Sequence, residues 1–215
     1  MVPRYLYKEP TMKTLLQINT SIFSGGGQSS HLADAFVAAR KAIHPGLKVI
    51  ARDFAKEPVP HLTGDGFQGF LAKPEERTPE QARIVAYSDA LIDELRRADT
   101  IVIGLPMYNF SVPSTLKAYF DHVARAGVTF KFTDKGPVGL LTGKKAYVFA
   151  ARGGVYLGTT ADTQTAYLRQ FLGFLGIADV EFVYAEGLAM GDTIRKSALE
   201  KAETVIAGLN ELAAA

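Results

Sequence analysis

The stretch that decides the fold of this chain is TIVIGLPMYNFSVPSTLKAYF, residues 100–120. Its β-branched run at 101–103 lacks polar alternation, which predicts a strand that is covered on both faces. The strand ends near Pro106, and Pro113 stands where a helix begins, followed by apolar residues at helical spacing. In an open parallel sheet, ligands bind at the carboxyl ends of strands, so the loop at 107–110 is a candidate ligand loop. The alternative is a loop whose aromatic side chains fill the core.

Four further buried-type strands alternate with helices along the rest of the chain. This alternation predicts an α/β fold with a doubly wound, five-stranded parallel sheet and helices on both faces. We expect the strand order 2-1-3-4-5, in which the first, third and fourth strands are neighbours. The other strands are predicted at 14–18, 47–53, 145–151 and 179–185, and the helices at 32–43, 78–95, 113–126, 161–174 and 192–212.

Two segments are longer than the connections of a compact domain need. Residues 54–78 suggest a functional flap or a dimer contact, with a short helix near 66–71. The sequence TPEQ at 78–81 predicts a capping box that starts the next helix. Residues 127–142 are predicted to form a hairpin with exposed aromatic side chains. On the helix before that hairpin, we expect Asp121 and Arg125 to form an ion pair four residues apart.

Composition excludes several classes of protein. The 215 residues include 24 basic and 22 acidic ones and no run of like charge, so the sequence shows no footprint for nucleic acid or a membrane surface. The chain has no cysteine, and its four histidines lack metal-ligand spacing, so we expect no metal site. No signal-peptide pattern is visible, and we expect a cytoplasmic protein. We divide the chain into an arm at 1–11, which is either an upstream start or a contact with a partner subunit, and one domain at 12–215.

The first strand is followed by a loop that suits a phosphate. Residues 20–30 contain five hydroxyl side chains and three consecutive glycines, followed at once by a helix. Backbone N–H groups, hydroxyls and the positive end of a helix together bind anions. The loop has no lysine or arginine, and the patterns of nucleoside triphosphate and dinucleotide sites are absent. These features favour a single terminal phosphate, such as that of flavin mononucleotide (FMN).

The other two loops suit a flat ring with polar edges. The Asn109 amide and backbone N–H groups could bind the pyrimidine edge of a flavin, flanked by the apolar side chains of that loop. Gly153 and Gly154 could bring backbone N–H groups close to the N1 and O2 edge, where reduced flavin is anionic. Arg152 either adds to this stabilisation or caps a strand end in solvent. Because the carboxyl ends of adjacent parallel strands share one edge, we expect the three loops to converge there.

The chain from about residue 12 onward resembles the FMN-dependent NADH-azoreductase family, within the flavodoxin-like quinone reductases. The resemblance rests on PMYNF at 106–110, ARAGVTF at 124–130, RGG at 152–154, FLGF at 171–174 and YAEG at 184–187. It implies an FMN enzyme that is a homodimer, with NADH or NADPH as reductant and azo compounds or quinones as acceptors. Family members often have serine where this chain has Gly27 and Ala151, so two hydroxyl contacts to the flavin would be absent.

The resemblance also implies which residues form the site. The flavin would be held by Ser21, Gly27, Gln28, Ser29, Pro106, Met107, Tyr108, Asn109, Phe110, Ala151, Arg152, Gly153 and Gly154. Phe132 and a Phe174 from the partner subunit would line the substrate pocket. No side chain is assigned as a catalytic acid or base, because the flavin carries the redox chemistry.

Three functions follow from this interpretation. The first is a two-step enzyme, in which NAD(P)H and the acceptor use the same flavin face in turn, which predicts ping-pong kinetics. The second is a flavodoxin-type electron carrier without its own reductant site, which the mildly basic charge and the insertion at 127–142 disfavour. The third is a flavin-free regulatory or interaction protein with a decayed site.

Overall fold

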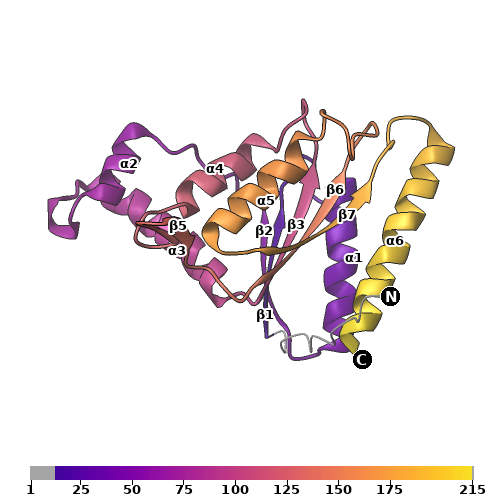
Figure 1. The fold of residues 1–215 in the computed structure, drawn as a ribbon, viewed down its shortest axis with the longest axis horizontal. Coiled ribbons are helices and arrows are strands. Elements are labelled where there is room, and N and C mark those ends of the chain that lie inside the picture. Colours follow the sequence, from indigo (N-terminus) through magenta and orange to yellow (C-terminus); the bar gives the residue numbers. More distant parts are fainter. Residues whose placement is uncertain (1–12, 215) are drawn as a thin grey trace.

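The structure is a computed structural model that describes residues 13–214. Its main feature is a five-stranded parallel sheet in the order β2-β1-β3-β6-β7 (Figure 1). In chain order these are the second, first, third, fourth and fifth strands of the sheet, so the predicted order is confirmed. The arm predicted at 1–11 lies outside the described residues. The strands are β1 (Thr14–Asn19), β2 (Lys48–Asp53), β3 (Thr100–Pro106), β6 (Lys145–Ala151) and β7 (Asp179–Ala185).

Helices cover both faces of the sheet (Figure 1). On one face, α1 (Gln28–Ile43) and α6 (Asp192–Ala214) pack on a core that includes Val102 and Phe149. On the other face, α3 (Pro79–Arg97), α4 (Ser114–Val123) and α5 (Thr163–Leu175) pack on a core that includes Ile101, Ile103 and Val148. Every residue of β3 is buried, as the unbroken apolar run predicts. Within residues 13–214, no helix combines the length and the apolarity that crossing a bilayer requires.

The helix ends follow local sequence signals. Thr78 and Gln81 form the predicted capping box, with each side chain accepting a hydrogen bond from the other residue's backbone N–H. Helix α5 ends at Gly176, whose φ of 102° lies in the left-handed region that glycine adopts without steric cost.

Both long segments carry structure of their own. The first forms α2 (Gly64–Leu71) and a 3₁₀ turn (Pro74–Glu76), which lie at the far end of α3 from the sheet (Figure 1). The second forms the predicted hairpin from β4 (Phe130–Thr133) and β5 (Gly136–Gly139). The hairpin joins the body where Leu141 N donates to Leu175 O at 2.9 Å. A Cβ on Gly139 would overlap the backbone of Gly176, so only glycine fits at that junction.

The predicted ion pair between Asp121 and Arg125 is wrong. Helix α4 ends at Val123, two residues before Arg125, so the helical spacing does not extend that far. Asp121 instead pairs with Lys117 on the same helix (Nζ to Oδ1, 2.5 Å), and Arg125 reaches Asp89 on α3 (Nη1 to Oδ1, 2.5 Å). Arg125 therefore ties the start of the hairpin segment to α3.

Candidate functional site

Three loops meet at the carboxyl edge of the sheet, as the strand order predicts. The loops follow β1, β3 and β6, and direct contacts join them. The Tyr108 hydroxyl lies 3.3 Å from Ser21 Oγ and accepts the N–H of Ile22 at 3.2 Å. Met107 N donates to Ala151 O at 3.1 Å. The loops therefore form one continuous surface.

The loop after β1 wraps round the start of α1. The N–H groups of Gly26 and Gly27 both donate to Phe23 O at 3.2 Å, and Gly27 becomes the N-cap of α1 without a capping side chain. The first-turn N–H groups of α1 are therefore left for another acceptor. Gln28 and Ser29 are the first two residues of that turn.

Ser29 carries an unsatisfied hydroxyl at this helix end. The residue is 0% exposed, and its Oγ has no hydrogen-bond partner among residues 13–214. A buried polar atom without a partner is unfavourable, so its presence beside the positive end of α1 indicates an anion-binding position. Only glycine fits at position 27 beside Ser21: a Cβ there would lie 2.6 Å from Ser21 Cβ and would overlap Ser21 Oγ.

The outer rim of the same loop is held by two side chains. Ser24 Oγ donates to Asp53 Oδ2 at 2.5 Å, and His31 Nε2 lies 2.5 Å from Gly25 O. Both contacts draw the loop back toward β2 and α1. Ser29 and Ser30 lie in the first turn of α1.

The loop after β3 forms a strained turn. Tyr108 and Ser111 exchange backbone hydrogen bonds at 3.2 and 3.0 Å. Between them, Asn109 has a φ of 48° and Phe110 a φ of 60°. Two consecutive positive φ values are typical of a type I′ turn, and residues other than glycine adopt them at a cost. Both side chains are exposed at the edge of the sheet, and the Phe110 ring lies 5.7 Å from that of Tyr156.

The loop after β6 is built on a buried arginine. The Arg152 side chain is 0% exposed and pairs with Asp162 at 2.8 Å and Glu186 at 3.0 Å. Its guanidinium also lies over the Tyr184 ring, 5.0 Å from the centroid. Burial by itself raises the pKa of Asp162, but hydrogen bonds from Thr165 and Arg152 outweigh it and hold the pKa below its ordinary value. The alternative in which Arg152 caps a strand end in solvent is therefore wrong.

The backbone of this loop faces two ways. The carbonyls of Gly153 and Arg152 accept the N–H groups of Ala189 and Leu188, at 2.9 and 3.1 Å, so they point toward the segment after β7. Because C=O and N–H of a trans peptide point in opposite directions, the N–H groups of Gly153 and Gly154 point away from that segment. Neither N–H has an acceptor within residues 13–214. Two adjacent donors are thus available at this end of the surface.

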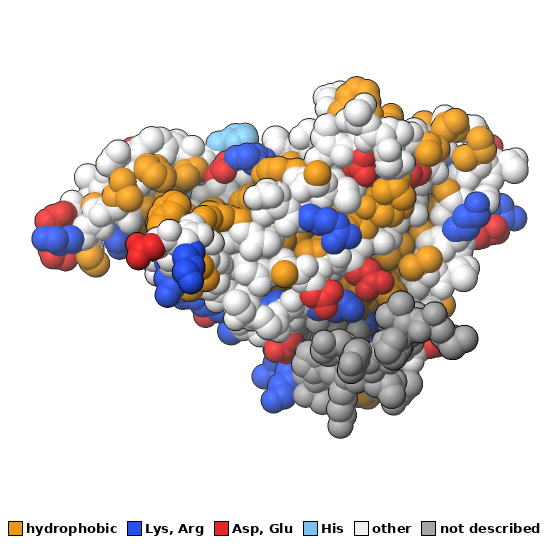
Figure 2. All heavy atoms as spheres, viewed as in Figure 1, with side chains coloured by type: hydrophobic (Ala, Val, Ile, Leu, Met, Phe, Trp, Pro, Cys, Tyr) orange, Lys and Arg blue, Asp and Glu red, His pale blue; other side chains and the backbone are white. Residues whose placement is uncertain are grey.

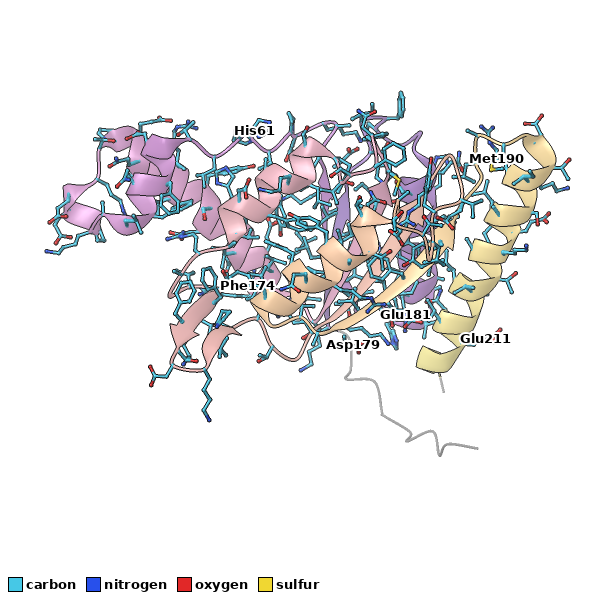
Figure 3. All side chains as sticks on the ribbon, turned by 45° about the horizontal axis from the view of Figure 1, so that its top comes forward. His61, Phe174, Asp179, Glu181, Met190 and Glu211 are labelled. Atoms are coloured by element: carbon cyan, nitrogen blue, oxygen red, sulfur yellow. The ribbon has the colours of Figure 1, made fainter. Side chains whose placement is uncertain are left out.

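Phe132 and Phe174 lie elsewhere in the chain. Both contact Phe130, with ring centroids 5.4 and 4.3 Å apart, and Phe132 is 73% exposed on the hairpin. Figure 3 shows Phe174 at the end of α5, about 16 Å along the helix from Thr163 at a rise of about 1.5 Å per residue. The two phenylalanines are therefore together, but they do not meet the three loops of their own chain.

A cavity of about 340 Å³ opens beside the strained turn. It lies between α4 and α5, and one of its lining residues, Ser111, directly follows Phe110. The lining residues are Ser111, Val112, Ser114, Lys117 and Tyr167.

Within residues 13–214, no group of three or more His, Asp or Glu side chains is arranged to hold a metal ion.

Sequence reasoning missed the buried polar residues beneath the loops. They are Asp162, Gln164 and Glu186, and none was predicted to contribute to the site. Glu186 offered a signal, because it stands in YAEG at 184–187, directly after a buried strand. Its carboxylate accepts the N–H groups of Tyr156 and Leu157, at 2.9 and 3.1 Å. Such contacts between distant segments follow from the fold and leave no local pattern.

Known proteins share this architecture over nearly the whole chain. The model of a family described by its flavodoxin-like fold matches residues 12–208. An FMN-dependent NADH:quinone oxidoreductase of Cellvibrio japonicus (strain Ueda107) is 55% identical over 192 residues, which cover 89% of this chain and 96% of that protein. An FMN-dependent NADH:quinone oxidoreductase 6 of Burkholderia lata is 52% identical over 196 residues, covering 91% and 99%.

Solved structures agree with these relatives. An azoreductase from Bacillus anthracis str. Sterne is 33% identical, with a TM-score of 0.81 over 91% of this chain and 99% of that one. An FMN-dependent NADH-azoreductase from Bacillus anthracis str. Ames Ancestor, solved in complex with FMN, is 27% identical, with a TM-score of 0.81 over 93% of this chain and 100% of that one. The chain therefore belongs to the flavodoxin-like family of quinone oxidoreductases and azoreductases.

Proposed function

We propose that this chain is an FMN-dependent oxidoreductase that takes electrons from NADH and passes them to quinones or azo compounds. One observation carries the proposal. The three loops form a single surface with a helix-end anion site at one end. At the other end are two backbone donors, on Gly153 and Gly154, that have no acceptor within residues 13–214. That arrangement matches a ligand with a phosphate at one end and a polar ring edge at the other. The names of the relatives support the same cofactor and reaction.

The phosphate end fits this chain's residues. The Ser29 hydroxyl is buried and has no partner in the described part of the chain, and the uncapped first turn of α1 supplies backbone donors. Ser21 fills the space that a side chain at position 27 would need, so its hydroxyl lies where the family often has a second serine. We assign Ser21, Gly27, Gln28 and Ser29 to the phosphate.

The ring end fits as well. The N–H groups of Gly153 and Gly154 would face the N1 and O2 edge, and Asn109 would face the pyrimidine edge. When bound, FMN supplies the chemistry of accepting a hydride from NADH and delivering two electrons to the acceptor. Arg152 acts beneath the loop through Asp162 and Glu186, since its guanidinium is buried in those pairs. The residues assigned to the ring are Pro106, Met107, Tyr108, Asn109, Phe110, Ala151, Arg152, Gly153 and Gly154.

We propose a homodimer in which Phe132 and Phe174 serve the partner's site. Both contact Phe130 and lie far from their own loops, so both would come from the same subunit. Exposed apolar side chains on α2 and the hairpin support an interface there, including Phe67 and Leu71 on α2 and Val138 on β5. Figure 2 shows hydrophobic side chains gathered at the α2 end of the molecule.

We propose ping-pong kinetics, in which NADH and the acceptor use the same face of the flavin in turn. NADH would have to leave before the acceptor enters. Steady-state rates at several fixed NADH concentrations, with a quinone varied, test this: parallel double-reciprocal lines support it, and intersecting lines contradict it. A cytoplasmic location stays a prediction.

The first experiment is reconstitution with FMN, followed by an assay with NADH and a quinone. A yellow protein that oxidises NADH in proportion to the quinone supports the proposed enzyme. A yellow protein that NADH leaves oxidised would point to an electron carrier. A protein that binds no flavin would point to a regulatory or interaction role.

A further inference from the structure

Gln164, the second residue of α5, makes three hydrogen bonds beneath the loops that follow β3 and β6. The residue is 1% exposed. Its Nε2 donates to Pro106 O at 2.9 Å and to Ser111 O at 3.0 Å, and its Oε1 accepts from Arg152 Nε at 3.2 Å. The first turn of α5 lies at the same edge of the sheet as the loop after β3 (Figure 1). One buried amide thus binds the loops after β3 and β6 together.

The two acceptors on the β3 side bracket the strained turn. Pro106 lies before Asn109 and Phe110, and Ser111 lies directly after them. Both central residues have positive φ values, and such a conformation persists only where its surroundings hold it in place. Thr163, next to Gln164, adds a bond from its hydroxyl to Phe110 O. The start of α5 therefore holds the turn from below.

Arg152 fixes which way the amide points. Arginine donates and does not accept hydrogen bonds, so the atom of Gln164 that faces Arg152 Nε has to be the oxygen. The NH₂ group then faces the two carbonyls of the β3 loop. Arg152 is itself held by Asp162 and Glu186, so the amide has one favourable orientation.

We infer that Gln164 is a positioning residue that couples the Asn109–Phe110 turn to the Gly153–Gly154 loop and sets the distance between their flavin contacts. This inference rests on the proposed function, since it concerns flavin binding at that site. Gln164 itself does not reach the three-loop surface, because it is buried beneath it. Its effect acts on the ring end of the site and leaves the phosphate end unchanged.

The test compares two substitutions with a matched control. Gln164→Met removes all three hydrogen bonds and keeps a side chain of similar length. Gln164→Glu keeps an acceptor for Arg152 but removes the two donors. Gln170→Met makes the same change at an exposed position on the same helix. Each protein is titrated with FMN and with riboflavin, which lacks the phosphate, and the two-electron potential of the bound flavin is measured. The melting temperature without flavin reports on folding.

We expect both Gln164 variants to bind FMN and riboflavin about tenfold more weakly, in line with the loss of one or two net hydrogen bonds. The fold-change should be the same for both ligands, because the phosphate loop is untouched. The potential should become more negative, because less well placed donors stabilise reduced flavin less. Gln170→Met should match the wild type in all four measurements: FMN affinity, riboflavin affinity, flavin potential and melting temperature.

Several results would overturn the inference. One is wild-type affinity and potential in both Gln164 variants. Another is a lower melting temperature with unchanged flavin affinity, which would show a role in stability alone. If Gln164→Met does not fold, Gln164→Glu decides by the same criteria, and Gln164→Asn, which keeps the donors on a shorter side chain, should recover part of the affinity. A wild-type protein that binds no flavin would overturn the proposed function and this inference with it.

Discussion

Replacing Ser29 by alanine should stabilise the flavin-free protein and weaken FMN binding. The Ser29 hydroxyl is fully buried and has no partner among the described residues, so the flavin-free protein bears the cost of an unsatisfied polar group. That cost is about 1–3 kcal/mol. At the lower end, its removal raises the melting temperature by about 2–4 °C for a chain of this size.

The same substitution removes a donor to the phosphate. A hydrogen bond to a charged group contributes about 1.5–3 kcal/mol, which corresponds to an increase of about 10- to 150-fold in the Kd for FMN. Riboflavin has no phosphate, so its affinity should not change. An increase in stability combined with a loss of affinity is not expected from a general defect in folding.

Thermal unfolding without flavin and fluorescence titration with both flavins measure these effects. Ser197→Ala, at a half-buried position on α6, serves as the control variant. An alanine variant with an unchanged or lower melting temperature and wild-type FMN affinity would refute the assignment of Ser29 to the phosphate. A loss of affinity for riboflavin as large as that for FMN would refute it as well.

Three further predictions concern stability. Gly139→Ala should lower the melting temperature by several degrees, because the new Cβ overlaps the backbone of Gly176 and overpacking costs about 1–3 kcal/mol. Gly208→Ala, on α6 where a Cβ meets nothing within 4 Å, should raise stability by about 1 kcal/mol in denaturant titrations, and a loss there would contradict the reasoning. Burial lowers the pKa of His122 in the folded protein. As pH falls below about 6.5, the unfolded chain therefore binds a proton at this histidine more readily than the folded protein does. The folded protein is expected to lose stability in that range. Between pH 7 and 5, the melting temperature of His122→Gln should fall less with decreasing pH than that of His44→Gln. Equal slopes of melting temperature against pH in the two variants would contradict this.

Local signals were sufficient to predict the framework. The capping box at Thr78, the glycine that ends α5 and the apolar run of β3 each depend on a few neighbouring residues, and each was confirmed. The strand order followed from the alternation of buried strands and helices, and the convergence of the loops followed from the order. The hairpin was predicted at 127–142, and both of its strands lie within that segment.

Contacts between distant segments could not be predicted in this way. Arg152 lies next to two glycines at a strand end, which is a common place for a solvent-exposed cation. Its partners Asp162 and Glu186 stand 10 and 34 residues away, and only the packing of α5 and β7 brings them together. The error at Arg125 has a related cause. The sequence continues an apolar helical pattern past Val123, whereas the helix ends there and Arg125 turns toward α3.

The unpartnered groups at the site are also invisible in a sequence. Serine and glycine in a loop usually form only a turn. What distinguishes this loop is that Ser29 is buried at a helix end without a hydrogen-bond partner among the described residues. At the other end of the same surface, the N–H groups of Gly153 and Gly154 have no acceptor among those residues either. Those facts depend on how three loops are placed by one sheet.

Anaerobic titration of the FMN-loaded protein with NADH is the decisive test of the proposed enzyme, because it requires both a bound flavin and access for the reductant. We expect one FMN per chain, and loss of the visible flavin band with one equivalent of NADH per flavin. Addition of a quinone without oxygen should then restore the band. A protein that retains no FMN, or whose bound FMN stays oxidised in excess NADH, is not the proposed oxidoreductase.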